Sequence, residues 1–112
     1  MTKYRVSYSD DHSGVQIATD GAVEMELAKI LELMDKILGT HGSFINVADD
    51  AGNLITFFAD EEPGALLLDM PSPREKGSYA KRATLAECKT VLTGLAGKID
   101  RGSVEGLVFE RW

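Results

Sequence analysis

The stretch that decides the fold runs from residue 43 to residue 70 and reads SFINVA, DDAGN, LITFFA, DEEPG, ALLLDM. Three apolar runs alternate here with two clusters of Asp, Asn, Gly, Glu and Pro, and such clusters favour turns. Short apolar runs joined by turns of this kind are typical of neighbouring antiparallel strands. The stretch therefore predicts a three-stranded antiparallel meander over residues 43–48, 54–59 and 65–70.

The middle run, residues 54–59, is apolar on both of its faces. Side chains alternate along a strand, so residues 54, 56 and 58 face one way and residues 55, 57 and 59 face the other. Only Thr56 is polar among these six residues. Both faces of the sheet therefore need cover: one can take a helix, and the other needs a second element or another protein.

The residues before the meander predict a hairpin and a helix. Tyr4, Val6 and Tyr8 alternate with polar residues, as in a half-exposed strand, and residues 15–18 follow a turn as a short return strand at the edge of the sheet. Next comes an amphipathic helix, for which Asp20 is a candidate N-cap and Gly39 a stop signal. Its apolar stripe consists of Val23, Leu27, Ile30, Leu31, Met34, Ile37 and Leu38.

Residues 71–82 combine two prolines, a glycine and several basic residues, which predicts a surface loop. Thr84 and Glu87 then fit a capping box at the start of a second helix, which Gly94 and Gly97 are expected to end early. Cys88 lies on the apolar side of this helix, so we expect it to be a buried core residue. That side consists of Leu85, Cys88, Val91, Leu92, Leu95, Ala96 and Ile99.

The tail, residues 102–112, closes with an apolar run that predicts a last strand. We expect the terminal Trp112 to pack back on the core or to lie in an interface, where Trp is enriched. A chain of 112 residues is one domain of common size. The prediction is a single α+β domain over residues 1–112, in which an N-terminal hairpin, the central meander and a C-terminal strand form an antiparallel sheet packed with two amphipathic helices.

The charge is unevenly distributed. The formal net charge is −6, and no Lys or Arg occurs between Lys36 and Arg74. An acidic stretch of this kind repels nucleic acid and attracts a basic protein, which leads us to expect a partner-binding surface there. Acidic turns that only keep the sheet soluble are the alternative. The candidate partner-binding residues are Asp49, Asp50, Asp60, Glu61, Glu62 and Asp69.

No catalytic or metal-binding signature is visible. Cys88 is the only cysteine, and His12 and His41 are isolated, so we expect neither a disulfide nor a metal site. Residues 49–60 have the length of a calcium loop but lack its Gly and its final Glu. Ser78 and Lys81 match S-x-x-K without its companion motifs. We expect a protein that is not an enzyme and that needs no cofactor.

The N-terminus lacks the apolar core of a signal peptide, and no apolar run reaches the roughly 18 residues that cross a bilayer. We therefore expect a cytoplasmic protein that does not bind membranes.

The order of these elements, the D-x-x-G-N turn of residues 49–53 and a strand ending near Trp112 resemble the Imm1-type immunity proteins of bacterial polymorphic toxin systems. That family usually has Gly-x-Arg-Pro before its last strand, whereas residues 97–102 here read GKIDRG and contain no Pro. The resemblance implies a protein that neutralises a cognate toxin, many such toxins being nucleases or nucleic-acid deaminases, and we expect that toxin to have a basic surface. The sequence leaves open whether the chain is a monomer or a homodimer. Its acidic turns would then mimic phosphate in the toxin's cleft.

Two other functions fit the same residues. One is a non-catalytic binding or scaffold subunit, for example a homodimer that pairs across the uncovered face of the sheet. The other is a small ligand-binding or hydrolytic domain, which would need an apolar pocket with converging polar groups.

Overall fold

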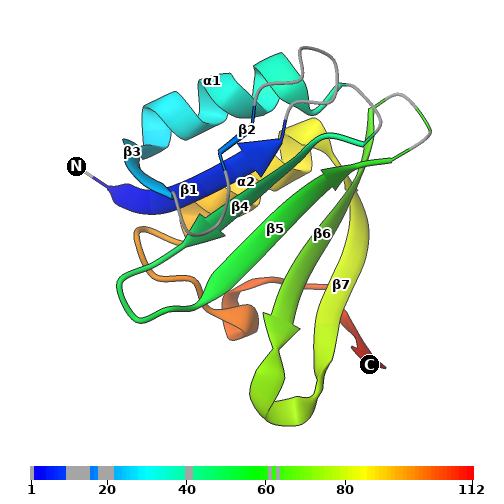
Figure 1. The fold of residues 1–112 in the computed structure, drawn as a ribbon. Helices are drawn as coiled ribbons and strands as arrows, with labels where there is room; N and C mark the ends of the chain where they lie inside the picture. Colours follow the sequence, from blue (N-terminus) through cyan, green and yellow to red (C-terminus); the bar gives the residue numbers. More distant parts are fainter. Residues whose placement is uncertain (1, 10–15, 18–21, 40–41, 61, 63) are drawn as a thin grey trace.

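A computed structural model describes residues 2–9, 16–17, 22–39, 42–60, 62 and 64–112. Within these residues the chain forms one antiparallel sheet of eight strands and two α-helices, so the predicted α+β class is confirmed (Figure 1). The helices are α1 (Leu27–Ile37) and α2 (Leu85–Gly94), with short 3-10 turns η2 (Pro73–Glu75) and η3 (Arg101–Ser103). The strands are β1 (Lys3–Ser9), β2 (Gln16–Ile17), β3 (Val23–Glu26), β4 (Phe44–Ala48), β5 (Leu54–Ala59), β6 (Ala65–Ser72), β7 (Gly77–Thr84) and β8 (Val108–Arg111).

The strand order is β2-β1-β4-β5-β6-β7-β8, and β3 pairs with β1 on the same side as β2. The meander is confirmed as β4, β5 and β6, paired in sequence. The N-terminal hairpin is confirmed by the pairing of β1 with β2, and the last strand by the pairing of β7 with β8.

Both helices lie on the same face of the sheet, and the opposite face carries neither of them (Figure 1). The core forms between the helices and the sheet because alternate strand residues point toward the helices. Tyr4, Ile45, Phe57, Leu68 and Ile30 are among its fully buried side chains. We call the other surface of the sheet the open face; it carries the strand side chains that point away from the helices.

The apolar stripe predicted that residues 23–26 belong to the helix, and this prediction is wrong. They form β3, which pairs with β1 through Val6 opposite Val23 and Lys3 opposite Glu26. The sequence VEME fits the alternation of a strand as well as the spacing of a helix. The backbone groups at the edge of β1 can pair with an extended segment but not with the first turn of a helix. The rest of the stripe is confirmed, because Ile30, Met34 and Ile37 are buried. Asp20, the predicted N-cap, lies outside the described residues.

The predicted surface loop over residues 71–82 is also wrong. β6 continues to Ser72, η2 makes the turn, and β7 returns antiparallel to β6 over eight residue pairs. Pro71 lies within β6, Pro73 begins η2, and Lys76 closes the turn with a positive φ of 55°. The turn is short, and the residues read as a loop are mostly strand.

The second helix begins and ends as predicted. Thr84 Oγ1 accepts a hydrogen bond from the Glu87 N–H at 3.1 Å, and the Thr84 N–H donates to Glu87 Oε1 at 3.2 Å, which completes the capping box. The helix ends at Gly94. Cys88 is fully buried, and burial raises the pKa of its thiol to about 12.

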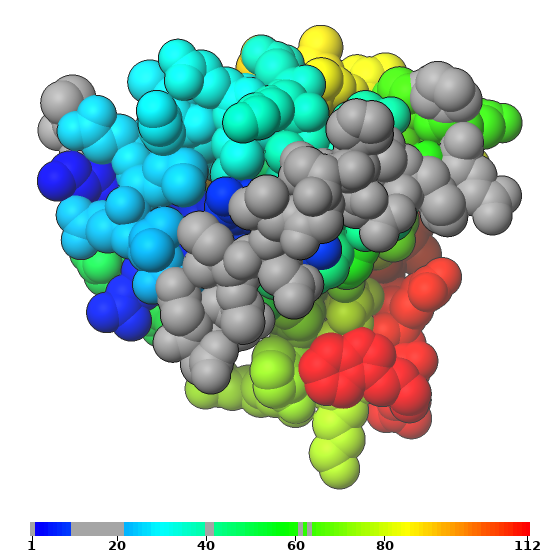
Figure 2. Space-filling view, turned by 45° about the horizontal axis from the view of Figure 1, so that its top comes forward, coloured from blue at the N-terminus to red at the C-terminus, as the bar shows by residue number. Residues whose placement is uncertain are grey.

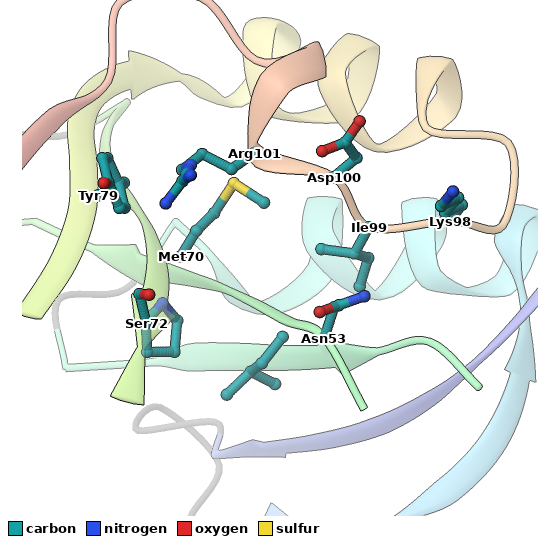
Figure 3. A pocket seen from close by; sticks show the side chains of 10 residues that line it. Asn53, Met70, Ser72, Tyr79, Lys98, Ile99, Asp100 and Arg101 are labelled. Atoms are coloured by element: carbon teal, nitrogen blue, oxygen red, sulfur yellow. The ribbon is translucent and has the colours of Figure 1, made fainter. Parts of the chain in front are cut away.

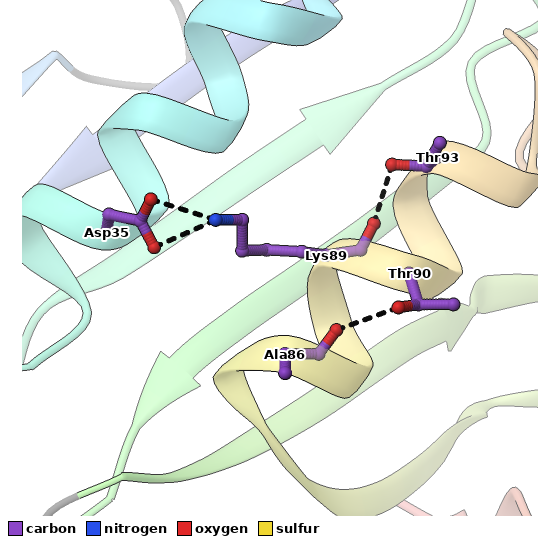
Figure 4. A network of polar contacts seen from close by, with 5 residues as sticks. All are labelled: Asp35, Ala86, Lys89, Thr90 and Thr93. Carbon is purple, nitrogen blue, oxygen red and sulfur yellow. Dashed lines mark hydrogen bonds and ion pairs between the residues drawn. The ribbon is translucent and has the colours of Figure 1, made fainter.

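One ion pair joins the two helices at their exposed surfaces. Lys89 Nζ of α2 donates to both carboxylate oxygens of Asp35 of α1, at 3.0 and 2.8 Å (Figure 4). Thr90 and Thr93 donate their hydroxyl groups to backbone carbonyls one turn earlier in α2. Of these bonds, only the Asp35–Lys89 pair connects the two helices, whereas the threonine bonds lie within α2.

Candidate functional site

A row of polar side chains crosses the open face at one register position. Ser7, Asn46, Thr56 and Asp69 lie opposite one another on β1, β4, β5 and β6. Asn46 Nδ2 donates to Ser7 Oγ at 3.1 Å, and Thr56 Oγ1 donates to Asn46 Oδ1 at 2.7 Å. Ser7 and Thr56 are only 3% and 5% exposed, although neither α1 nor α2 lies on this face. The row is therefore an ordered network and not a set of freely moving surface groups.

Asp69 ends the row in an incompletely satisfied position. The Ser78 hydroxyl hydrogen-bonds to its carboxylate, and Ser78 Oγ in turn accepts from Trp112 Nε1 at 2.9 Å. The Asp69 Oδ1 oxygen is buried and has no hydrogen-bond partner among the described residues. Burial raises the pKa of Asp69, and the charge of Glu110 raises it further, against the lowering effect of Ser78.

An apolar row lies next to the polar row. Phe44, Phe58 and Leu67 are in register on β4, β5 and β6, and the two phenyl rings are 5.9 Å apart. Phe58 and Leu67 are each 37% exposed. On the other side of the polar row, a hollow of about 320 Å³ is lined by Arg5, Ser7, Ala22, Asn46, Ala48 and Leu54. The open face thus combines exposed apolar groups with fixed polar ones, which is the composition of a protein-binding surface.

The predicted acidic residues that the structure describes do not form one surface. Asp49 and Asp50 lie at the β4–β5 turn, whereas Asp60 and Glu62 lie at the β5–β6 turn, at the opposite end of β5 (Figure 1). Asp69 lies between these ends on the open face. Glu61 lies outside the described residues. Asp50 and Glu62 are exposed, and Asp60 forms an ion pair of 3.1 Å with Arg82, so one of the expected charges is compensated within the chain.

Asp49 has a structural role. It is 6% exposed, and its oxygens accept hydrogen bonds from the backbone N–H groups of Ala51, Asn53 and Ile99 and from the Asn53 amide, at 2.8 to 3.1 Å. Burial by itself would raise the pKa of this carboxyl, but the hydrogen bonds from Asn53, Ile99 and Ala51 lower it below the usual range. Because its acceptors are occupied inside the fold, Asp49 is unsuited to contact a partner.

A second hollow, also about 320 Å³, lies where β5 begins and β6 ends (Figure 3). Arg101 points toward Tyr79 there, with its guanidinium carbon 4.1 Å from the ring centre, and forms a 2.8 Å ion pair with Glu75. The Tyr79 hydroxyl also donates to Glu75. These hydrogen bonds lower the pKa of Glu75 and raise the pKa of Tyr79. The hollow is lined by Asn53, Leu54, Met70, Pro71, Ser72, Tyr79, Lys98, Ile99, Asp100 and Arg101.

The S-x-x-K match does not assemble a nucleophile and a base. Ser78 pairs with Pro71 on the open face, whereas Lys81 pairs with Leu68, whose side chain points into the core. Residues three positions apart on a strand point to opposite faces. Sequence reasoning missed the polar row. Its only signal in the sequence is that each of the four strand segments has a polar residue at one position that faces away from the core.

Comparisons with protein-family models, with curated proteins and with solved structures found no match to this chain. No helix among the described residues is long and apolar enough to cross a membrane.

Proposed function

We propose that this chain acts by binding another protein through the open face of its sheet, and that the partner is a basic protein of the bacterial toxin class. The observation that carries the proposal is the pair of adjacent rows on that face. The Phe44, Phe58 and Leu67 row supplies apolar area, and the hydrogen-bonded polar row beside it links β1, β4 and β5, which keeps that area in a fixed arrangement.

The acidic residues are spread over the surface, so they are better placed to attract a partner from the rim of the interface than to fill one cleft of it together. Asp50 and Glu62 are exposed at the two ends of β5, so they flank the open face at its opposite ends. Charges at the rim of an interface mainly steer encounter, and buried apolar groups at its centre supply most of the affinity. With a net charge of −6, the chain attracts a basic partner, which the rows on the open face then hold.

The resemblance of the sequence to Imm1-type immunity proteins supplies the partner class. In that arrangement the chain sits in the cytoplasm of the producing cell and blocks a toxin that acts on nucleic acid. Its own contribution is steric and electrostatic, without a chemical step.

The test uses the protein encoded by the adjoining reading frame, which the proposal expects to be a toxin, titrated with this chain by calorimetry. The double variant Phe58→Gln, Leu67→Gln is expected to raise the Kd at least about 30-fold, since central apolar contacts dominate interface affinity. Val23→Gln is the matched control, because Val23 is 40% exposed but is opposite the core residue Val6, so it lies on the helix side of the sheet and not on the open face. It should leave the Kd unchanged.

Three results would overturn the proposal: no binding to that protein, an equal loss of affinity in the control variant, or full affinity in the double variant. Circular dichroism and thermal unfolding of each variant exclude a folding defect as the cause.

A further inference from the structure

Strand β8 is the outermost strand of the sheet and has β7 as its only paired strand in the described part of the chain. The Trp112 N–H donates to the Lys76 carbonyl at 2.9 Å, which fixes the direction of the backbone groups of β8. The direction of the backbone N–H and C=O groups alternates from one residue to the next along a strand. The backbone groups of Val108 and Glu110 therefore point toward β7, as the N–H of Trp112 does, and the backbone groups of Phe109 and Arg111 point outward. The outer edge therefore presents two donors and two acceptors.

This edge lacks several of the features that commonly protect an outer strand, although it is only four residues long and carries two charged residues, Glu110 and Arg111. All four residues of β8 are exposed, and the strand contains no Pro, no Lys and no bulge. Val108 is 63% exposed and the adjoining Trp112 68% exposed. The C-terminal residues, red in Figure 2, stand at the rim of the molecule, away from α1. An edge of this kind is a template for another strand.

The edge is also held in place. The Phe109 ring lies over Gly77, where an added Cβ would come within 2.5 Å of the ring, and it is tilted against Tyr79 with ring centres 5.0 Å apart. The Trp112 indole is tethered to Ser78. A strand fixed by these contacts loses little conformational freedom when a partner strand adds to it.

We propose that β8 is a self-association edge, on which a second copy of this chain pairs antiparallel through its own β8. The pairing places Phe109 opposite Arg111 of the second copy and Glu110 opposite Glu110 of the second copy. The two sheets then form one continuous sheet, with all helices on one side and both open faces on the other.

The register follows from the backbone directions and the side chains. The outward backbone N–H and C=O groups of one copy must face those of the second copy. This leaves three registers: Phe109 opposite Phe109 of the second copy, Arg111 opposite Arg111, or Phe109 opposite Arg111. The first sets Val108 against Glu110, and the second sets two cations against each other. The third places each guanidinium beside a phenyl ring and each Val108 beside Trp112, both favourable cross-strand pairs. Its one unfavourable pair is Glu110 with Glu110.

Cysteine cross-linking tests the edge and its register together. Glu110→Cys sits on the two-fold axis at a non-hydrogen-bonded pair, where the Cα separation suits a disulfide. Under mild oxidation it should form covalent dimer at least about tenfold faster than Ala86→Cys, an exposed control position on α2 that lies off the edge. The native Cys88 is buried and stays in place. Equal rates in the two variants, or a faster reaction of Phe109→Cys than of Glu110→Cys, would overturn the proposal.

Sedimentation equilibrium of the chain alone, up to about 1 mM, gives a second measurement. Glu110→Gln removes the like-charge pair and should strengthen association about twofold to fivefold. Arg111→Pro removes an outward N–H that β7 does not use, so it should abolish association without changing thermal unfolding. A monomeric wild type, or an Arg111→Pro variant that still associates, contradicts the proposal. No toxin is present in these experiments, so their failure leaves the proposed function standing.

Discussion

Asp49 Oδ2 accepts a hydrogen bond of 2.9 Å from the backbone N–H of Ile99, which lies 50 residues later in the chain. The carboxylate that closes the first turn of the meander therefore also fixes the segment after α2. We expect Asp49→Asn to lower the free energy of unfolding by about 2 to 3 kcal/mol near neutral pH, since charged acceptors are lost and an amide N–H faces backbone donors. Urea unfolding measures the loss, and exposed Asp50→Asn is the control.

The same variant has a pH dependence with a defined sign. The pKa of Asp49 in the folded chain is lower than its ordinary value of 3.8. Its contribution to stability is therefore complete above pH 3.8 and is lost as the pH falls through the folded-state pKa. The difference in unfolding free energy between wild type and Asp49→Asn should shrink in that acidic range. A difference that grows there would contradict the assignment.

Asp69→Asn should act in the opposite direction. Burial and Glu110 raise the pKa of Asp69, so its charged form costs folding free energy above the ordinary pKa of 3.8, and the cost disappears below it. The neutral amide should stabilise the fold near neutral pH by about 1 kcal/mol, the lower end of the cost of an unsatisfied buried polar group. The gain should vanish in acid. Exposed Glu105→Gln, measured beside it, should show neither effect.

Gly77→Ala should displace the Phe109 ring and loosen β8. An added Cβ would lie 2.5 Å from the ring and from the Glu110 carbonyl oxygen, and relieving such contacts costs about 1 to 3 kcal/mol. Trp112 is the only tryptophan, so its fluorescence reports the loss of its contact with Ser78. Gly94→Ala is the matched control, because no atom lies within 4 Å of an added Cβ there. An unchanged emission spectrum in Gly77→Ala would refute the contact.

The Asp35–Lys89 pair between the helices should contribute little. The two side chains are 54% and 31% exposed, and a double-mutant cycle with Asp35→Ala and Lys89→Ala should give a coupling of about 0.5 to 1 kcal/mol that falls with added salt. A coupling above about 2 kcal/mol would mean that the pair is desolvated in solution.

The rim charges can be tested apart from the open face. Reversing exposed Asp50 and Glu62 to Lys should slow association with the basic partner and reduce its salt dependence, with a smaller effect on dissociation. Stopped-flow association rates at two salt concentrations measure both quantities. Glu105→Lys, a reversal distant from β5 in the chain, is the control. Unchanged association rates in the double reversal would remove the electrostatic part of the proposal.

Local sequence signals predicted the elements whose formation depends on local chemistry. Gly52 and Gly64 have the positive φ values expected of glycines in turns, and Thr84 caps α2 as its spacing with Glu87 predicts. Residues 23–26 were ambiguous because helical spacing and strand alternation coincide over four residues. Only the free edge of β1, a tertiary feature, decides for the strand.

The candidate site needed strand registers that no local pattern contains. Successive turns of a meander fall at opposite ends, so acidic residues close in sequence, such as Asp50 and Glu62, are separated by the length of β5. Conversely, Ser7 and Asp69 are distant in sequence, and pairing through β4 and β5 brings them into one row.

The Tyr4 hydroxyl accepts a hydrogen bond of 2.9 Å from the Gly97 N–H, across 93 positions of sequence. A contact of this span cannot form until residue 97 has left the ribosome. Completion of the core therefore waits for that late segment, and until then the early strands expose apolar side chains that a chaperone would recognise.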